Sequence, residues 1–356
     1  MQPTPPPRLH PVRLWQLCLN RRVRPVCIAR RHPVLRVKAL RLDPFLVALV
    51  ATVVLASLLP CYGEGARVMG WVTDGAIALL FFLHGARLSR EAILAGLGAW
   101  RIHGLALGST FVLFPAMGLV LRALSHGWLN PAIADGLLFL CLLPSTVQSS
   151  IAFTSIARGN VPAAVCSASA SNLIGIFITP LLTGLLLLGG PRGGFSLHAV
   201  EAIMLQLLLP FVLGHLSRPL TKAFLEGHRS VIGKVDRSVI LLVVYTAFSA
   251  AVIEGLWHKY SWSDLGWTVA LNAVLLALAL TLTRLVARWA GLKREDEIAV
   301  VFCGSKKSLA SGVPMAGVLF PPTLLGPMIL PLMLYHQMQL MACAVLARRY
   351  AARPAQ

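Results

Sequence analysis

Polar side chains able to hold an ion or a polar solute gather at two points of this 356-residue chain. Within residues 141–160, Pro144 is followed at once by hydroxyl and amide side chains, and residues 302–317 carry two adjacent lysines between glycines and serines. Hydroxyl, amide and ammonium groups bind ions and polar solutes by hydrogen bonding. The candidate binding residues of these two stretches are Ser145, Thr146, Gln148, Ser149, Ser150, Ser305, Lys306, Lys307 and Ser308.

Both stretches interrupt long apolar runs, so each is expected to break a membrane-spanning helix. In hydrocarbon, a backbone released from helical hydrogen bonds must be satisfied by protein or by a water-filled cavity. Hydroxyl groups alone are equally consistent with close packing between helices. Two breaks at corresponding places in two halves of a chain are typical of secondary transporters built from repeats.

The two lysines are the most costly residues to place in a membrane. A lysine at mid-bilayer costs on the order of 2.5–3.5 kcal/mol on the insertion scale. Lys306 and Lys307 both lie about ten residues from the nearest end of their apolar run, too far for the side chains to reach the interface easily. We therefore expect at least one of them to face a cavity.

The apolar run that follows the first break adds an amide. Ser171 and Asn172 adjoin each other there, and Ser167 lies one helical turn before Ser171 on the same face. The serines could serve helix packing alone, but an amide in hydrocarbon requires hydrogen-bond partners. Asn172 and Ser171 therefore join the candidate site.

The composition indicates an all-α, polytopic membrane protein. Hydrophobic residues make up 57% of the chain, charged residues 13%, and the mean hydropathy is +0.75. Soluble domains carry roughly a quarter of charged residues. The seven cysteines are odd in number and lack paired spacing, which favours neither a disulfide framework nor a zinc site.

Ten apolar runs are long enough to cross a bilayer as helices. The fourth and the ninth hold the two breaks, so each half has five spans with the break in its fourth. Because five is odd, the halves must have opposite orientations, which predicts two inverted repeats over residues 43–190 and 191–350. The runs are 44–61, 68–86, 101–122, 131–157, 161–188, 199–217, 237–255, 265–287, 297–320 and 323–347.

Positive charge places both termini in the cytoplasm. With that orientation, 26 of the 32 Lys and Arg residues lie in inner segments and 4 in outer ones, as the positive-inside rule requires of a bacterial inner (plasma) membrane protein. The net charge of +19 thus reflects topology, and we discount nucleic acid as a partner.

Residues 1–42 form a basic, Pro- and Arg-rich tail with no acidic residue. Two interpretations stay open. The tail is either a cytoplasmic arm that contacts anionic lipid or the result of a wrongly assigned start, with the natural start near Val37.

The residues of both breaks resemble the bile acid:sodium symporter family. The run Leu-Pro-Ser-Thr-Val-Gln-Ser-Ser (143–150), the segment Val-Pro-Ala-Ala-Val-Cys-Ser-Ala-Ser-Ala-Ser-Asn (161–172) and the run Phe-Cys-Gly-Ser-Lys-Lys-Ser-Leu-Ala-Ser-Gly-Val-Pro (302–314) are most similar to its SBF-like branch. That branch includes bacterial transporters regarded as sodium-dependent and the seventh member of human solute carrier family ten. The resemblance covers about residues 37–350.

The resemblance implies a ten-helix fold in which spans 1, 2, 6 and 7 form a panel and the others a core, where broken helices 4 and 9 cross. It also implies sodium held by polar residues of spans 4, 5 and 9, with an organic anion beside the crossing. Ser149 and Ser150 match a pair that contacts sodium, and the region of Ser171 and Asn172 matches the hydroxyl contribution from span 5.

The chain departs from this pattern in span 9. Phe302 and Lys306 align with a sodium-binding glutamate and glutamine of well-studied members. A phenyl ring cannot neutralise a cation, and an ammonium would repel one. The hypothesis is that Lys306 or Lys307 takes the place of sodium on the free carbonyls and that a protonation change provides coupling.

The sequence therefore predicts a secondary carrier of a small organic, anionic solute, working by alternating access, with sodium or a proton as the coupling ion and no other cofactor. The alternative is a membrane regulator of ion homeostasis that uses the same fold without transport. An intramembrane enzyme is not expected, because no nucleophile with a histidine or acid at motif spacing is present. No nucleotide-binding loop appears either, which disfavours an ATP-driven pump.

Overall fold

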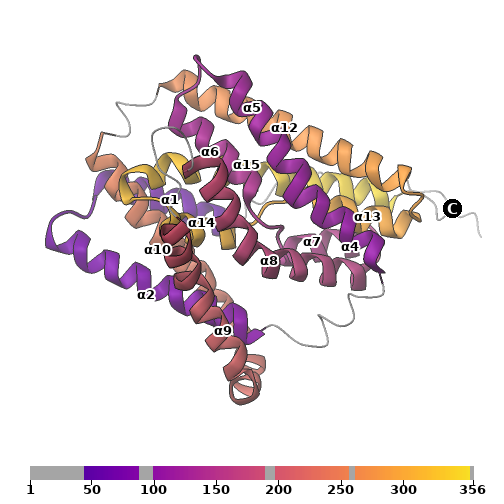
Figure 1. Cartoon of the computed structure of the whole chain (residues 1–356), viewed down its shortest axis with the longest axis horizontal. Coiled ribbons are helices and arrows are strands. Elements are labelled where there is room, and N and C mark those ends of the chain that lie inside the picture. Colours follow the sequence, from indigo (N-terminus) through magenta and orange to yellow (C-terminus); the bar gives the residue numbers. More distant parts are fainter. Residues whose placement is uncertain (1–43, 88–98, 189–196, 256–260, 353–356) are drawn as a thin grey trace, which may run out of the picture. The chain divides into compact units, whose positions relative to one another are not determined.

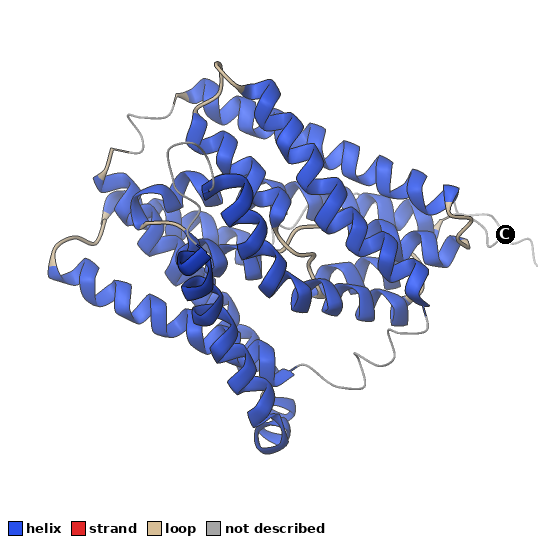
Figure 2. Cartoon of the chain, viewed as in Figure 1, coloured by secondary structure: helices blue, strands red, loops and turns tan. Residues whose placement is uncertain are grey.

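The computed structural model describes residues 44–87, 99–188, 197–255 and 261–352, and every regular element within these ranges is a helix (Figures 1 and 2). The chain divides into the units Met1–Leu42 and Asp43–Gln356. The tail lies outside the described residues, so both interpretations of it stay predictions.

Helices occupy each of the apolar runs. Their bounds are α1 Pro44–Leu58, α2 Glu64–Arg87, α4 Trp100–Gly108, α5 Phe114–Ser125, α6 Pro131–Leu142, α7 Gln148–Ile156, α8 Val161–Thr183, α9 Leu197–Gly227, α10 Arg229–Ile253, α12 Trp262–Trp289, α13 Arg294–Gly304, α14 Leu309–Leu319 and α15 Pro322–Ala351. A π-helical turn, η3 (Ser109–Leu113), joins α4 to α5, and a second, η4 (Gly184–Leu188), follows α8.

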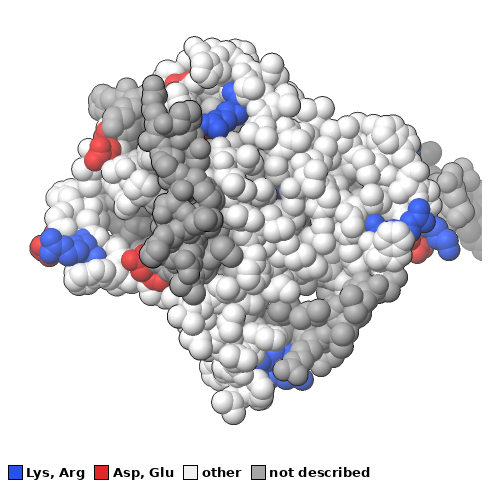
Figure 3. All heavy atoms as spheres, in the orientation of Figure 1, with Lys and Arg blue, Asp and Glu red and all other residues white. Residues whose placement is uncertain are grey.

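Six of these helical segments are long and apolar enough to cross a membrane. Figure 3 shows one face of the molecule, where uncharged atoms dominate and charged side chains gather in a few separate spots. Many large apolar side chains are exposed, among them Leu58, Trp71 and Leu220, as expected for a surface in contact with lipid. The chain is therefore a multi-pass membrane protein.

The two predicted interruptions are present. Between α6 and α7 the helix stops over residues 143–147, and between α13 and α14 it stops over residues 305–308 (Figure 2). Pro144 lacks an N–H and disfavours helical geometry in the residue before it, and Leu143 accordingly has extended backbone angles. Ser308 caps α14 by accepting a hydrogen bond from the Ser311 N–H.

One group of helices is formed by α1, α2, α9 and α10. Helix α2 lies against α9 at two glycines, because a Cβ on Gly85 would collide with the Phe211 carbonyl and one on Gly214 with the Phe82 carbonyl. Such backbone-to-backbone contact is a common way of packing membrane helices. Helix α10 packs in turn on α1, α2 and α15.

The second group surrounds the breaks. Helix α15 lies against α6, α12 and α14, while α13 lies against α4, α7, α8 and α12. The shared interior contains large, fully buried side chains such as Phe114, Phe139, Phe302 and Tyr335. This packing holds the two breaks inside the protein, where their polar groups need partners.

Candidate functional site

The two breaks contact each other directly. The Ser308 N–H donates to the Pro144 carbonyl at 2.9 Å. The Ser145 hydroxyl donates to the Cys303 carbonyl at 2.5 Å, and the Ser150 hydroxyl donates to that of Phe302 at 2.8 Å. Main-chain groups released by each break are thus satisfied by residues of the other.

Helix α8 ties the two breaks together through Ser171 and Asn172. The Ser171 hydroxyl accepts from the Ser145 N–H at 3.0 Å. The Asn172 amide donates to the Ser145 carbonyl at 2.8 Å and accepts from the Ser311 hydroxyl at 2.7 Å. Asn172 therefore bridges the first break and the start of α14, which explains why an amide is held within this span.

The carbonyls at the end of α6 all find donors. Helix α6 ends in orphan carbonyls that carry the negative end of its dipole. Three of them bind side chains or main chain of distant elements: that of Leu142 accepts from the Thr179 hydroxyl, and those of Cys141 and Leu143 accept from an ammonium group. With the bonds at Pro144 and Ser145, each carbonyl from residue 141 to residue 145 has a partner.

Lys307 supplies that ammonium. Its Nζ lies 2.8 Å from the Cys141 carbonyl, 2.7 Å from that of Leu143 and 2.9 Å from that of Thr110, in the π-helical turn η3. The ammonium also lies 4.2 Å from the centre of the Phe114 ring, at a distance for a cation–π contact. The side chain is fully buried, so Lys307 acts as an internal cation at the end of α6.

Lys306 has a different environment, although it is only one residue away. Its Nζ lies 4.0 Å from the centre of the Phe153 ring and 5.8 Å from that of Phe302. Among the described residues, this ammonium has no hydrogen-bond partner, and its side chain is also fully buried. Two aromatic faces thus replace the polar partners that a buried charge normally requires.

Two further residues of the site were not predicted. Gln339 of α15 accepts from the Lys307 N–H at 2.9 Å and donates to the Lys307 carbonyl at 2.8 Å, and Tyr335 donates to the Ser305 carbonyl at 2.9 Å. Gln339 is an amide within an apolar helix, the signal that identified Asn172. The sequence contains no comparable signal for Thr110, because that residue contributes its main chain.

A cavity of about 740 Å³ adjoins the two breaks. One wall comes from α7, α8, α14 and α15, and the other from α1, α2, α9 and α10. Five of the predicted site residues line it, and these are Thr146, Gln148, Ser149, Asn172 and Ser308.

Both half-helices that leave the breaks begin at this cavity. Gln148 and Ser149 open α7, which has no side-chain cap, and Leu309 and Ala310 open α14. Helix N-termini present unpaired N–H groups and a partial positive charge, which favour anions. The N-termini thus face the cavity.

The facing wall is basic. Arg229, Lys234 and Arg237 line the cavity, and Arg87 does so while paired with Asp236 at 2.6 and 2.8 Å. The lining therefore holds four cationic side chains and one carboxylate. These residues were predicted only as cytoplasmic charges, since nothing in the sequence indicates which loop-proximal residues share a cavity.

The other predicted site residues lie inside the protein. Neither lysine lines the cavity, in contrast to the expectation that at least one would, because the freed carbonyls and two aromatic rings enclose the ammonium groups. The fully enclosed candidates are Ser145, Ser150, Ser171, Ser305, Lys306 and Lys307.

Comparison with known proteins identifies relatives over most of the chain. Residues 43–352 match the profile of the SBF-like CPA transporter family. An uncharacterized protein of Pseudomonas aeruginosa is 59% identical over 87% of this chain and 93% of its own length, and the Escherichia coli protein named "Putative symporter YfeH" is 55% identical over 87% and 93%. The Mus musculus sodium/bile acid cotransporter 7 is 28% identical over 86% and 92%.

Proposed function

Because the chain belongs to the SBF-like CPA transporter family, a family of membrane transporters, we propose that it moves a small organic, anionic solute by secondary active transport. Ten spans in two inverted five-helix repeats cross the inner membrane, with both termini in the cytoplasm. Alternating access exchanges the solute between the two sides.

The anionic nature of the solute rests on the cavity, which is the single observation that carries the proposal. Two half-helix N-termini face it from one wall and an excess of basic side chains from the other. A carboxylate or sulfate between them would receive main-chain N–H bonds and long-range attraction from the arginines. A cation would meet repulsion from both walls.

The proposal of alternating access is supported by the position of the cavity between two groups of helices. The wall of α1, α2, α9 and α10 corresponds to the panel that the resemblance implies, and the other wall contains residues of both interrupted helices. The basic residues of the lining lie at the C-terminal end of α2 and the N-terminal part of α10, the predicted cytoplasmic ends. With the predicted orientation, we infer that this conformation exposes the cavity to the cytoplasm.

We assign the coupling of solute transport to an ion gradient to the lysines rather than to a bound sodium ion. The chain lacks the acid that would neutralise sodium, since Phe302 stands at that position, and Lys307 already occupies the carbonyls at the end of α6. At the predicted sodium residues, the Ser150 hydroxyl donates its proton to a carbonyl and the Asn172 amide is engaged on both sides. A proton is therefore the proposed coupling ion.

The experiment is uptake into proteoliposomes that contain the purified full-length chain. Organic carboxylates and sulfates are offered with a proton gradient, a sodium gradient or neither. We expect uptake of an anion that responds to the proton gradient. Sodium-driven uptake that is insensitive to pH would refute the coupling, and uptake of cations alone would refute the solute class. Saturable binding of an anion without flux under every gradient would favour the regulator instead.

A further inference from the structure

A second hollow, of about 540 Å³, lies between α12 and α15, on elements that do not line the cavity described above except for α15. Three arginines and a set of apolar side chains line it. The arginines are Arg284, Arg288 and Arg349, and the apolar wall includes Leu285, Val345 and Leu346.

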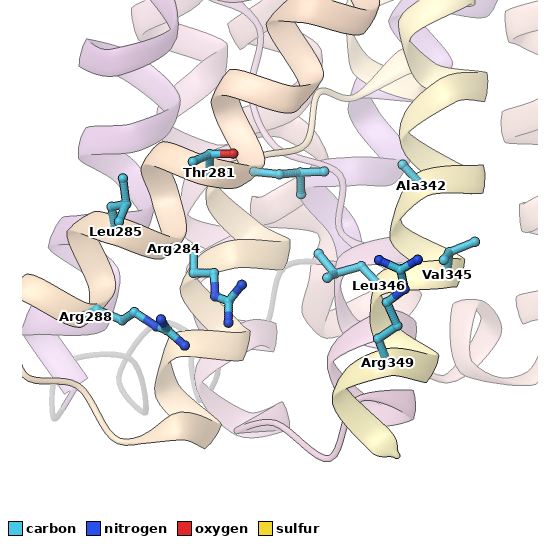
Figure 4. A pocket seen from close by; sticks show the side chains of 9 residues that line it. Thr281, Arg284, Leu285, Arg288, Ala342, Val345, Leu346 and Arg349 are labelled. Atoms are coloured by element: carbon cyan, nitrogen blue, oxygen red, sulfur yellow. The ribbon is translucent and has the colours of Figure 1, made fainter. Parts of the chain in front are cut away.

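Two of the arginines of this groove, Arg288 and Arg349, lie near the C-terminal ends of α12 and α15. Figure 4 shows the arginines at one end of the groove, and Thr281 and Ala342 at the other. Trp289, the last residue of α12, is 82% exposed just beyond Arg288. Exposed tryptophan at the end of a membrane helix is typical of the interface between headgroups and hydrocarbon. Arg288 and Arg349 therefore lie near headgroup level, and Leu285, Val345 and Leu346 lie up to about one helical turn farther from the helix ends.

The groove has an excess of positive charge. Glu297, at the start of α13, forms ion pairs with Arg284 at 3.2 Å and Arg288 at 3.1 Å, so one carboxylate pairs with two guanidinium groups. Three guanidinium groups and one carboxylate leave a net charge of +2 beside lipid, and Arg349 has no acidic partner among the described residues.

We propose that this groove binds an anionic phospholipid, with the phosphate on Arg288 and Arg349 and an acyl chain along Leu285, Val345 and Leu346. Charge complementarity selects an anion, because guanidinium groups bind phosphate oxygens in a fork geometry. The apolar wall favours a lipid over a free phosphate. Val345 is 53% exposed, and an acyl chain would bury its side chain, whereas a soluble anion would leave it exposed. Basic pockets between helices at the cytoplasmic side of membrane proteins suit anionic headgroups.

The test is a lipid titration of the delipidated, full-length chain in detergent, followed by native mass spectrometry. Phosphatidylglycerol is compared with phosphatidylcholine, and inorganic phosphate and glycerol 3-phosphate serve as headgroups without chains. We expect phosphatidylglycerol to bind at least about fivefold more tightly than phosphatidylcholine, and neither soluble phosphate to bind or to compete at equal concentration. Each basic residue near an anionic lipid contributes about fivefold in affinity.

Two variants and one control locate the binding. Arg349→Gln should weaken the binding of phosphatidylglycerol by about fivefold. The control is Arg348→Gln, which changes an exposed arginine one residue earlier on the same helix and outside the groove, and it should leave the affinity unchanged. Val345→Trp keeps every charge but fills the apolar wall, and should also weaken binding. Melting temperatures without lipid verify that all three variants are folded.

Equal affinity for the two lipids, competition by inorganic phosphate, or the same loss in Arg348→Gln as in Arg349→Gln would overturn the proposal. The measurement needs no solute and no flux, so it stands or falls independently of the transport assay.

Discussion

Replacing Lys307 with Met should destabilise the folded protein, whereas the same replacement at Lys306 should not. The two residues adjoin in the sequence and are both fully buried, so position and burial are matched. They differ in their partners. The ammonium of Lys307 donates to three carbonyls, while that of Lys306 faces aromatic rings.

The magnitude follows from those partners. Methionine in place of Lys307 leaves three buried carbonyls without their donor, at about 1–3 kcal/mol each. Relief from burying a charge offsets part of this loss, so that about 3–5 kcal/mol of the roughly 3–9 kcal/mol for three carbonyls is expected as the net cost. At Lys306, the lost cation–π contact is worth about 0.5–2 kcal/mol, and removing a buried charge without polar partners compensates for it.

The assay is thermal unfolding of the purified variants in detergent. For a chain of this size, each kcal/mol lost from the free energy of unfolding lowers the melting temperature by about 2 °C. The Lys307→Met variant should therefore melt roughly 6–10 °C lower than the unmodified chain. The Lys306→Met variant should melt within about 2 °C of the unmodified chain or above it. Equal shifts in the two variants, or an unchanged melting temperature for Lys307→Met, would refute the assignment of Lys307 as the internal cation of α6.

Three further predictions concern other contacts. Gly85→Ala should destabilise the protein by about 1–3 kcal/mol because a Cβ there meets a main-chain oxygen of α9, whereas Gly70→Ala, on the same helix in open space, should be neutral in the same unfolding assay. Ser150→Ala should cost about 1–3 kcal/mol, since a buried carbonyl at the end of α13 loses its donor; a melting temperature equal to that of the unmodified chain would contradict this. Asp236→Asn removes the one carboxylate that the described residues contribute to the cavity lining and should lower the KM for an anionic solute, with at most about 1 kcal/mol lost from stability; an increased KM would argue against an anion.

Hydropathy was sufficient to predict the helical membrane fold and both interruptions. Apolar runs of bilayer length leave few alternatives to helices, because a spanning backbone must satisfy its own hydrogen bonds. Pro144 and the polar residues after it located the first break, and Gly304 together with the lysines located the second. The number of ten spans, the inverted repeats and the orientation stay predictions.

Composition could not predict which polar residues face the cavity and which are enclosed. Ser149 lines the cavity while Ser150, the next residue, is buried against the end of α13, a difference of helix rotation that depends on tertiary packing. Likewise, Gln339 holds the second break through main-chain bonds, and only the structure shows that α15 lies there. Residues that act through their carbonyls, such as Thr110, have no side-chain signature at all.

The basic side of the cavity was also beyond sequence reasoning. Arg229 and Lys234 counted only as evidence for a cytoplasmic side, because every charged residue near a helix end fits that rule equally well. Their second role arises from the position of α10 opposite α7 and α14, across the cavity. In the proposed function, the same set of charges would set the topology and attract the anionic solute.

Under the proposed coupling of transport to protons, the contrast between the lysines predicts that Lys306 is the coupling group. Deprotonating Lys307 would take a donor from at least one of three buried carbonyls, so its charge is needed for the fold. Deprotonating Lys306 would break no hydrogen bond among the described residues and would relieve a buried charge, so that group can change its protonation while the helices stay packed. Uptake by Lys306→Met should therefore persist down a solute gradient but no longer respond to a proton gradient, with counterflow in proteoliposomes as the control for a functional carrier. A variant that retains the full proton response would place the coupling group elsewhere, because methionine cannot exchange a proton.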